Sequence, residues 1–340
     1  MKILVTGGAG FIGSHVAENL ANMRHRVTVL DDLSGGSLEN VPPGCEFVKG
    51  DIADDLMVND LFASHKFELV YHLAAYAAEG LSHFIRRYNY TNNLIGSVTL
   101  LNAAIRHGTR RFVFASSIAV YGTGQLPMKE DMIPHPEDPY GIAKRAFELD
   151  LAAAAAMFGI EYVVFRPHNV YGERQNIADP YRNVVGIFMN RIMRGEPMPV
   201  FGDGRQTRAF SYIGDVAPII VRGGFEAKAK NRIFNVGADE PVAVIDLARM
   251  VAGVLGVRPQ MVHLAPRQEV LHAFSDHAAV REAFGQEEHT PIRLGLERMA
   301  AWARSKGHQA LSPFTAIEIK QNLPKSWERL IPEPKPECKA

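Results

Sequence analysis

Cysteine is almost absent from this sequence, which has only Cys45 and Cys338 among 340 residues. Two cysteines so far apart cannot form a disulfide framework or a structural zinc site, and their scarcity fits a reducing compartment. A net charge is also absent, because 37 Lys and Arg residues balance 37 Asp and Glu residues. This balance argues against the basic surface of a nucleic-acid binder or of a protein that docks on anionic membranes.

Long apolar runs are missing as well. No window approaches the ~18 uninterrupted apolar residues of a transmembrane helix, and the first apolar run is too short for a secretory signal. The histidines are scattered, with no ligand spacing and no acidic partner at a helical offset, so we expect no metal site. The sequence therefore predicts a soluble, cytoplasmic protein that binds no metal, nucleic acid or membrane.

The clearest positive signal lies at the N-terminus, in the sequence MKILVTGGAGFIGSH. An apolar, β-branched run over residues 2–6 predicts a buried strand, and Gly7, Gly10 and Gly13 follow it at GxxGxxG spacing before a helical pattern. Gly7 allows a tight turn, Gly10 allows the backbone to approach a pyrophosphate, and Gly13 allows close helix packing. The pyrophosphate is expected at the positive end of the helix dipole.

Asp31 completes this signal. It follows a second predicted strand over residues 27–30, near the ~20-residue spacing of the acid that binds the adenosine ribose. Asp31 and Asp32 also repel a 2′-phosphate, and no Arg or Lys follows at once. The N-terminal stretch therefore predicts dinucleotide binding, with NAD favoured over NADP.

Strand and helix patterns alternate through the first half of the chain. We expect further elements at residues 47–50, 56–65, 69–73, 89–107, 111–117 and 139–158, and later helices at 184–194, 245–255 and 294–303. This alternation predicts an α/β fold with a Rossmann-type, doubly wound parallel sheet. We expect a dinucleotide-binding domain (1–170), a smaller, partly interleaved substrate-binding lobe (171–310) and a C-terminal extension (311–340) with a disordered end.

Tyr140 and Lys144 are the first candidates for chemistry. Asp138 and Pro139 predict a helix start, which places Tyr140 and Lys144 on one helix face, one turn apart. A phenol titrates near ~10, and a nearby ammonium, the helix N-terminus and an oxidised nicotinamide each lower its pKa toward the working range. Ser117 ends a predicted strand, where its hydroxyl can hydrogen-bond the same substrate oxygen as Tyr140. The three residues predict hydride-transfer chemistry.

The motifs TGGAGFIGSH, HLAA, SSIAVYG, PYGIAK and RPHNVYG resemble the extended short-chain dehydrogenase/reductase superfamily, in particular its NAD-dependent nucleotide-sugar epimerase/dehydratase branch. The resemblance spans residues 1 to about 304 and is strongest to UDP-glucose 4-epimerases. It implies a homodimer formed by the helices at 89–107 and 139–158, and a catalytic role for Ser117, Tyr140 and Lys144.

The resemblance also implies binding residues, with Asn93 steadying the region of the active-site serine. The implied cofactor site consists of Gly7, Gly10, Phe11, Ile12, Gly13, Asp31, Asp51, Ile52, Leu73, Ala74, Ala75, Asn93, Tyr140, Lys144 and Pro167. The implied nucleotide-sugar site consists of Ser117, Asn169, Val200, Phe201, Arg208 and Arg267.

The implied reaction inverts C4 of UDP-glucose and UDP-galactose through a transient 4-keto sugar and enzyme-bound NADH. Relatives that dehydrate or decarboxylate carry acids at the positions of Ile118 and Ala119, and 3,5-epimerases carry a cysteine at the latter, so those reactions are disfavoured. The alternatives are epimerisation of another nucleotide sugar (a UDP-uronic acid such as UDP-glucuronic acid, a UDP-N-acetylhexosamine, or a CDP or GDP hexose), a 4-keto sugar reductase, and an NAD-sensing or scaffold protein.

The loop at residues 76–83 departs from the family pattern. Ala77 replaces the cofactor-binding lysine of some 4-epimerases, while Glu79 and His83 are either substrate contacts or residues that cap a helix or face solvent. His168 replaces an aromatic residue, and Ala273 aligns loosely where a small side chain leaves room for an N-acetyl group. The identity of the sugar thus depends on segments outside the shared motifs.

Overall fold

A seven-stranded sheet forms the centre of the molecule, in the order β11-β6-β5-β4-β1-β2-β3, with all neighbours parallel. The computed structural model describes residues 1–124, 126–266, 270–285 and 289–330. The strands are β1 (Lys2–Thr6), β2 (Arg26–Asp31), β3 (Glu46–Lys49), β4 (Leu69–His72), β5 (Arg111–Ala115), β6 (Glu161–Pro167) and β11 (Arg232–Val236). The predicted parallel, doubly wound sheet is confirmed.

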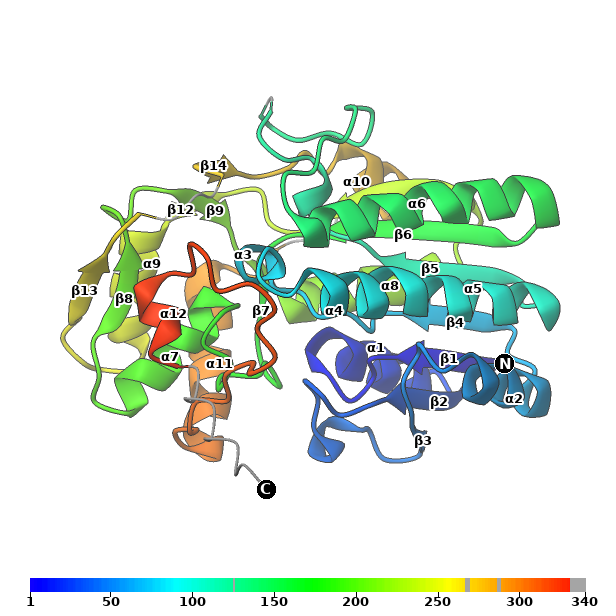
Figure 1. Ribbon diagram of the computed structural model, residues 1–340, viewed down its shortest axis with the longest axis horizontal. Helices are drawn as coiled ribbons and strands as arrows, with labels where there is room; N and C mark the ends of the chain where they lie inside the picture. The colour runs from blue at the N-terminus through cyan, green and yellow to red at the C-terminus, as the bar shows by residue number, and fades with distance from the viewer. Residues whose placement is uncertain (125, 267–269, 286–288, 331–340) are drawn as a thin grey trace, which may run out of the picture.

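Helices cover both faces of this sheet (Figure 1). One face packs against α2 (Asp55–His65), α5 (Gly96–Arg106) and α6 (Pro139–Phe158), and the other against α1 (Phe11–Asn22) and α8 (Ile213–Gly223). Neighbouring strand residues point to opposite faces. Leu4 therefore belongs to the apolar cluster under α2, α5 and α6, and Val5 belongs to the cluster under α1 and α8. Burial on both faces explains why these strands are continuously apolar.

After β6 the chain builds a smaller group of elements and also returns to the central sheet. The further elements are β7 (Val170–Tyr171), α7 (Val184–Met193), β8 (Met198–Phe201), β9 (Thr207–Ala209), β10 (Ser211–Tyr212), β12 (Pro241–Ala243), α9 (Val244–Val254), β13 (Met261–Leu264), β14 (His272–Ala273), α10 (Ala278–Phe284) and α11 (Ile292–Lys306). Their strands form the small sheets β10-β7, β12-β9-β14 and β13-β8. Because β11 lies in the large sheet and α8 packs on it, residues after 171 contribute to both parts.

The helix predicted over residues 89–107 is interrupted. The structure has α4 (Arg86–Tyr90), a π-helical turn at Thr91–Ile95, and then α5. The turn directs the buried Asn93 toward Tyr76, whose backbone N donates to Asn93 Oδ1 at 2.8 Å and whose O accepts from Asn93 Nδ2 at 3.1 Å. Such π turns frequently occur at functional sites. The remaining predicted elements are present with small shifts at their ends.

The C-terminal segment 311–330 packs against the chain between β4 and α4. This part of the fold contains the short helices α3 (Glu79–Ser82) and α12 (Lys325–Glu328), and Figure 1 shows the segment in red beside α7. The two segments share an apolar cluster that includes Ala78, Leu81, Ile85, Tyr76, Tyr88, Phe314, Leu323 and Trp327. The predicted disorder of the chain end falls on residues 331–340, outside the described part. No helix in the described part is long and apolar enough to cross a membrane.

Candidate active site

A cavity of about 810 Å³ lies at the carboxyl ends of the central strands. Its size suits a cofactor together with a small substrate. The predicted site residues that line it are Gly7, Gly10, Phe11, Ile12, Gly13, Asp31, Asp51, Ile52, Leu73, Ala74, Ala75, Ser117, Tyr140, Lys144, Pro167, Asn169, Phe201 and Arg208. The parallel sheet thus brings motifs from distant parts of the sequence to one place.

The glycine turn between β1 and α1 leaves room for an anion. Gly7 has a φ of +69°, a conformation that favours glycine, and a Cβ on Gly13 would lie 2.1 Å from the carbonyl O of Gly7. Gly10 precedes α1 and has no side chain to cap its first N–H groups. These N–H groups and the helix dipole face the cavity, so the turn fits the pyrophosphate of a dinucleotide.

Asp31 fixes the same turn. The carboxylate is 8% exposed, and it accepts hydrogen bonds from Ala9 N at 3.0 Å and from Leu33 N at 2.8 Å. Burial raises the pKa of this carboxyl, and the two backbone donors oppose that shift. Because Asp31 also lines the cavity at the end of β2, its free lone pairs suit the hydroxyls of a ribose.

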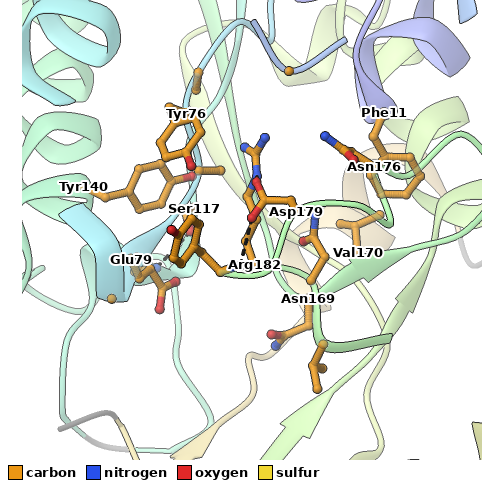
Figure 2. A pocket seen from close by; sticks show the side chains of 18 of the residues that line it. Phe11, Tyr76, Glu79, Ser117, Tyr140, Asn169, Val170, Asn176, Asp179 and Arg182 are labelled. Carbon is orange, nitrogen blue, oxygen red and sulfur yellow. Dashed lines mark hydrogen bonds and ion pairs between the residues drawn. The ribbon is translucent and has the colours of Figure 1, made fainter. Parts of the chain in front are cut away.

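Tyr140, Lys144 and Ser117 meet where β5 ends and α6 begins. Asp138 caps α6 by accepting a hydrogen bond from Gly141 N at 2.9 Å. Lys144 Nζ donates to Ala115 O at 2.8 Å and lies 5.7 Å from the centre of the Tyr140 ring. Ser117 lies close enough to the phenol to lower its pKa. Figure 2 shows Ser117 and Tyr140 on the same wall of the cavity.

Burial controls the protonation of this group. It raises the pKa of the Tyr140 phenol far above the usual value, the carboxylate of Glu79 raises it further, and Ser117 opposes the rise. Burial lowers the pKa of Lys144 to about 7. Among the chain's own groups, burial outweighs the lowering by Ser117 and Arg182. The sequence-based expectation also counts the oxidised nicotinamide, so a lowered phenol pKa stays a prediction for the protein with NAD⁺ bound.

The structure separates the roles of the adjacent serines. Ser116 Oγ donates to Glu148 Oε1 at 2.6 Å, whereas Ser117 approaches Tyr140. Glu148 also accepts two hydrogen bonds from Arg166, at 2.9 Å from Nε and 2.7 Å from Nη2, and both side chains are buried. This bidentate pair ties α6 to β6 and so fixes the position of the catalytic helix. Sequence reasoning missed it.

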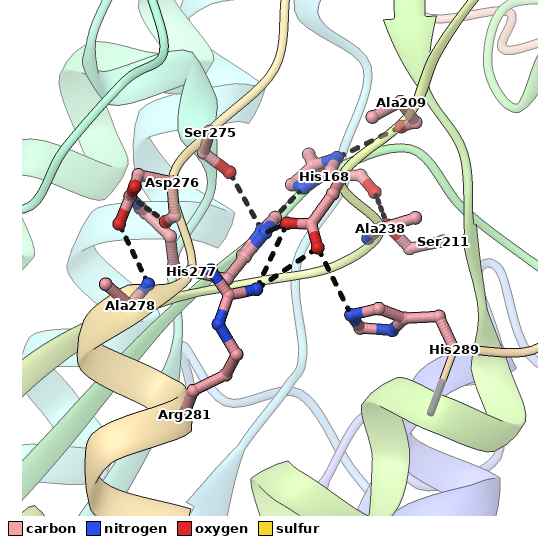
Figure 3. Close-up of polar contacts among 12 residues, drawn as sticks. His168, Ala209, Ser211, Ala238, Ser275, Asp276, His277, Ala278, Arg281 and His289 are labelled. Carbon is pink, nitrogen blue, oxygen red and sulfur yellow. Dashed lines mark hydrogen bonds and ion pairs between the residues drawn. The ribbon is translucent and has the colours of Figure 1, made fainter. Parts of the chain in front are cut away.

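The opposite wall carries Asn169, a non-glycine residue with a φ of +41°. Asn adopts this conformation more readily than most residues do. Behind it lies a cluster, drawn in Figure 3, around the buried His168 and His277, whose Nε2 atoms are 3.1 Å apart. His277 Nδ1 donates to Asp239 Oδ1 at 2.6 Å, and His168 Nδ1 donates to Ala209 O at 3.0 Å. The cluster holds the backbone on which Asn169 is displayed.

Two predicted binding residues do not line the cavity, and one lies outside the described residues. The side chain of Val200 is fully buried in the core, and its strand neighbour Phe201 faces the cavity instead. Asn93 is buried and holds the backbone of Tyr76, and through Asn89 it is also linked to Pro139 O at the start of α6. Arg267 lies outside the described part. Arg208 donates to backbone carbonyls, including Leu271 O at 3.0 Å.

The cavity also has residues that the sequence did not single out. Arg182 Nε donates to Asp179 Oδ2 at 2.6 Å, and its guanidinium carbon lies 4.6 Å from the centre of the Tyr76 ring. Trp327 of the C-terminal segment lines the cavity too. No local motif marks these residues, although the aromatic residues in the polar C-terminal segment were a usable signal.

Comparison with known proteins finds epimerases by family model, by sequence and by structure. The model described as "NAD dependent epimerase/dehydratase family" matches residues 3–237. A curated UDP-glucose 4-epimerase from Mycolicibacterium smegmatis is 34% identical over 316 residues, covering 90% of this chain and 99% of the relative. The solved UDP-glucose 4-epimerase of Thermotoga maritima, with UDP-glucose, is 35% identical with a TM-score of 0.84, covering 90% of this chain and 99% of that chain.

A further solved structure carries both kinds of ligand that the cavity suggests. The UDP-glucuronic acid 4-epimerase of Bacillus cereus, in complex with UDP-glucuronic acid and NAD, is 27% identical with a TM-score of 0.83 and covers 90% of this chain and 100% of that chain. The glycine turn, Asp31 and the group of Ser117, Tyr140 and Lys144 fit the dinucleotide. The chain therefore belongs to the NAD dependent epimerase/dehydratase family of extended short-chain dehydrogenases/reductases.

Proposed function

We propose that this protein is a nucleotide-sugar 4-epimerase that uses NAD and acts on UDP-glucose and UDP-galactose. The observation that carries the proposal is the meeting of Ser117, Tyr140 and Lys144 beside the dinucleotide turn in one cavity. Similarity to UDP-glucose 4-epimerases along nine-tenths of the chain supports the choice of sugar.

The chain's residues divide the work of the reaction. Bound NAD⁺ supplies the hydride acceptor and positive charge beside the phenol. Tyr140 takes the proton from the sugar 4-hydroxyl and later returns it, while Ser117 holds the same oxygen in place. Lys144 Nζ is anchored on Ala115 O and lies 5.7 Å from the centre of the Tyr140 ring, where its protonated form favours the phenolate. With NAD⁺ bound, the hydride lost from C4 would be held by the cofactor and returned to the opposite face of the 4-keto sugar, so that C4 would be inverted with no net redox change.

The residues after Ser117 favour this reaction over elimination. Ile118 and Ala119 follow it at the cavity edge and carry no group that can move a proton from C5 or C6 of the sugar. Dehydration or decarboxylation needs such a group next to the ketone. Simple inversion through the ketone remains as the reaction that the geometry supports.

The test is to incubate the protein with NAD⁺ and no reductant, separately with UDP-glucose, UDP-glucuronic acid, UDP-N-acetylglucosamine and GDP-mannose, and to follow each sugar by NMR. We expect UDP-glucose to equilibrate with UDP-galactose while the cofactor absorbance stays constant. Conversion of another sugar alone would correct the substrate. Stoichiometric oxidation of added NADH by a 4-keto sugar would instead identify a reductase.

We also infer a homodimer and a cytoplasmic location. The outer face of α6 supports the dimer, because Leu149 is 55% exposed, Met157 75% and Phe158 64%, and Ile95, in the turn before α5, is 53% exposed. Exposed apolar side chains gathered on one face are typical of subunit interfaces. The low cysteine content supports the location. Sedimentation analysis of the wild type and of Phe158→Glu tests the interface, and an unchanged dimer in the variant would place it elsewhere.

A further inference from the structure

Arg182 reaches the glycine turn from the opposite wall of the cavity. In the central sheet, β1 stands between β4 and β2. The guanidinium carbon of Arg182 lies 4.6 Å from the centre of the ring of Tyr76, in the loop after β4. A Cβ on Gly35, in the loop after β2, would lie 3.1 Å from Arg182 Nη2. Because this side chain approaches the loops on both sides of the turn after β1, it lies over the turn itself.

Both loops are fastened beside the turn. Ser37 N donates to Ala9 O at 2.9 Å, which joins the loop after β2 to the turn. Asn93 makes hydrogen bonds of 2.8 and 3.1 Å with the backbone of Tyr76, which fix the loop after β4 and the ring beneath the guanidinium. The chain's own contacts therefore order the surroundings of the guanidinium.

A carboxylate orients the guanidinium and leaves most of its donors available. Arg182 Nε donates to Asp179 Oδ2 at 2.6 Å, and Asp179 Oδ1 accepts from Tyr181 N at 2.9 Å. The two terminal NH2 groups of Arg182 make no hydrogen bond within the part of the chain that the structure describes. Figure 2 shows this side chain between Tyr76 and Phe11, the first residue of α1. Two NH2 groups directed into a cavity suit the paired oxygens of a phosphate.

The glycine turn lies in an acidic part of the cavity. The acids that line the cavity are Asp31 and Asp32 after β2, Asp51 after β3, Glu79 on α3, Glu137 and Asp138 before α6, and Asp179. Three of them follow the strands on one side of β1. The turn itself, residues 7–13, contains no Lys or Arg. A pyrophosphate bound at the turn is therefore stabilised by a cation that another segment supplies.

The other basic side chains of the cavity belong to other parts of its wall. They are Lys144 on α6, Arg191 on α7, Arg208 on β9, His83 after α3 and His168 after β6. Lys144 is bound to Ala115 O, and Arg191 is paired with Glu196. Arg208 donates to the carbonyl groups just before β14. Among the basic side chains in the described lining, Arg182 is the one that approaches both loops beside the turn.

We propose that Arg182 binds the pyrophosphate of NAD, with its terminal NH2 groups donating to phosphate oxygens. The glycine turn supplies backbone N–H groups and a helix dipole, and Arg182 adds the positive charge that the turn lacks. Arg182 lies two residues before α7, so the cofactor contacts the central sheet and the later part of the chain at once. The inference goes beyond the proposed function, because it concerns the cofactor and holds for any sugar.

The test is equilibrium dialysis of the full-length protein against labelled NAD⁺, with ADP-ribose and adenosine as competitors. ADP-ribose keeps the pyrophosphate without the nicotinamide, and adenosine lacks both. We expect Arg182→Met to weaken the binding of NAD⁺ and of ADP-ribose about tenfold or more, as the loss of a charge-assisted hydrogen bond does, and to leave adenosine binding unchanged. Arg182→Lys keeps the charge without the fork and should restore part of the affinity.

Two controls separate this role from others. Arg191→Met makes the same chemical change at another arginine of the cavity and is expected to leave NAD⁺ binding unaltered. Dialysis against labelled UDP distinguishes the dinucleotide from the nucleotide sugar, which also carries a pyrophosphate. We expect UDP to bind equally well to the wild type and to Arg182→Met.

The inference is overturned if Arg182→Met binds NAD⁺ as tightly as the wild type does. A loss confined to UDP also overturns it and assigns the arginine to the nucleotide sugar. An equal loss for adenosine overturns it as well, because a purely structural role would disturb every ligand of the turn. If Arg182→Met does not fold, Arg182→Lys decides, since it must bind NAD⁺ more weakly and adenosine equally. None of these readings depends on turnover, so failure of the proposed epimerisation remains distinguishable.

Discussion

The two sides of the cavity are built in different ways. The cofactor side comes from the ends of β1, β2, β4 and β5 and the start of α6, and hydrogen-bonded strand pairs hold these elements in register. The other side, which the proposed function assigns to the sugar and which is called the sugar side below, combines α3, the segment around Arg182, Phe201 of β8 and the C-terminal segment 311–330. Most of that side is irregular chain, held by side-chain contacts rather than by a sheet.

The difference shows which kind of function each side can support. A sheet edge holds reacting groups in fixed geometry, which hydride and proton transfer require. Irregular segments tolerate substitution and insertion, so they can change the accepted sugar without disturbing the chemistry. Variants on the cofactor side should therefore affect rate or folding, and variants on the sugar side, Arg182 excepted, should affect substrate choice.

The largest effect is expected from Tyr140→Phe. The change removes the proton acceptor and keeps the packing, so kcat should fall about 10²- to 10⁴-fold, as is typical of a general base. Turnover of UDP-glucose by NMR and NAD binding by fluorescence titration measure the two properties. We expect NAD binding to persist, and a variant that retained most of its activity would show that Tyr140 is not the base.

The next effect concerns stability on the cofactor side. Arg166→Met leaves the buried Glu148 without its bidentate partner, and we expect a loss of about 3 to 5 kcal/mol in the free energy of unfolding. Urea unfolding measures the loss. Arg293→Met breaks the exposed pair with Glu297, which has an N–O distance of 3.1 Å, and serves as a control expected to lose at most about 1 kcal/mol. Equal losses in both variants would contradict the anchoring role of the buried pair.

A smaller and more selective effect is expected on the sugar side. Trp327→Ala removes the side chain behind α3, so the KM for the nucleotide sugar should rise by about tenfold while NAD affinity is unchanged. Steady-state kinetics and NAD titration measure the two values. Leu56→Ala, at a 78% exposed residue outside the cavity, is the control. Parallel weakening of NAD binding would show that the two sides are not independent.

The last effect is a dependence of stability on pH. Burial lowers the pKa of His168 to about 3, below the value of an unfolded histidine, so the unfolded state binds the proton more readily. The contribution of His168 is therefore complete above about pH 6.5 and falls as the pH decreases, by about 2 kcal/mol between pH 6.5 and 5. His168→Asn should show a correspondingly flatter profile of unfolding free energy over this range. Identical slopes in both proteins would contradict this origin.

The sequence predicts the cofactor side well because its signals are local. The glycine turn, Asp31, and the pair of Tyr140 and Lys144 each follow from spacing within one element or one turn, and the parallel sheet that unites them is confirmed. Only three-dimensional packing reveals the bidentate contact of Arg166 with Glu148, because those residues lie on different elements.

The sugar side is less predictable for physical reasons. Val200 and Phe201 are adjacent in a strand, so an alignment error of one residue exchanges the core and the cavity faces. Asn93 turns inward through a π-helical turn that the periodic pattern does not reveal. Trp327 reaches α3 from the far end of the chain, and no spacing rule connects such distant residues.

The contact between Glu318 and α4 has a consequence for the order in which the molecule is built. Its hydrogen bonds join residues separated by 231 and 230 positions in the chain. During synthesis the first strands and helices emerge early, whereas this contact cannot form until almost the whole chain has left the ribosome. Closing so long a loop is also slow compared with local folding. The nascent protein can therefore form the first strands of the central sheet before it completes the wall that α4 and the C-terminal segment build together.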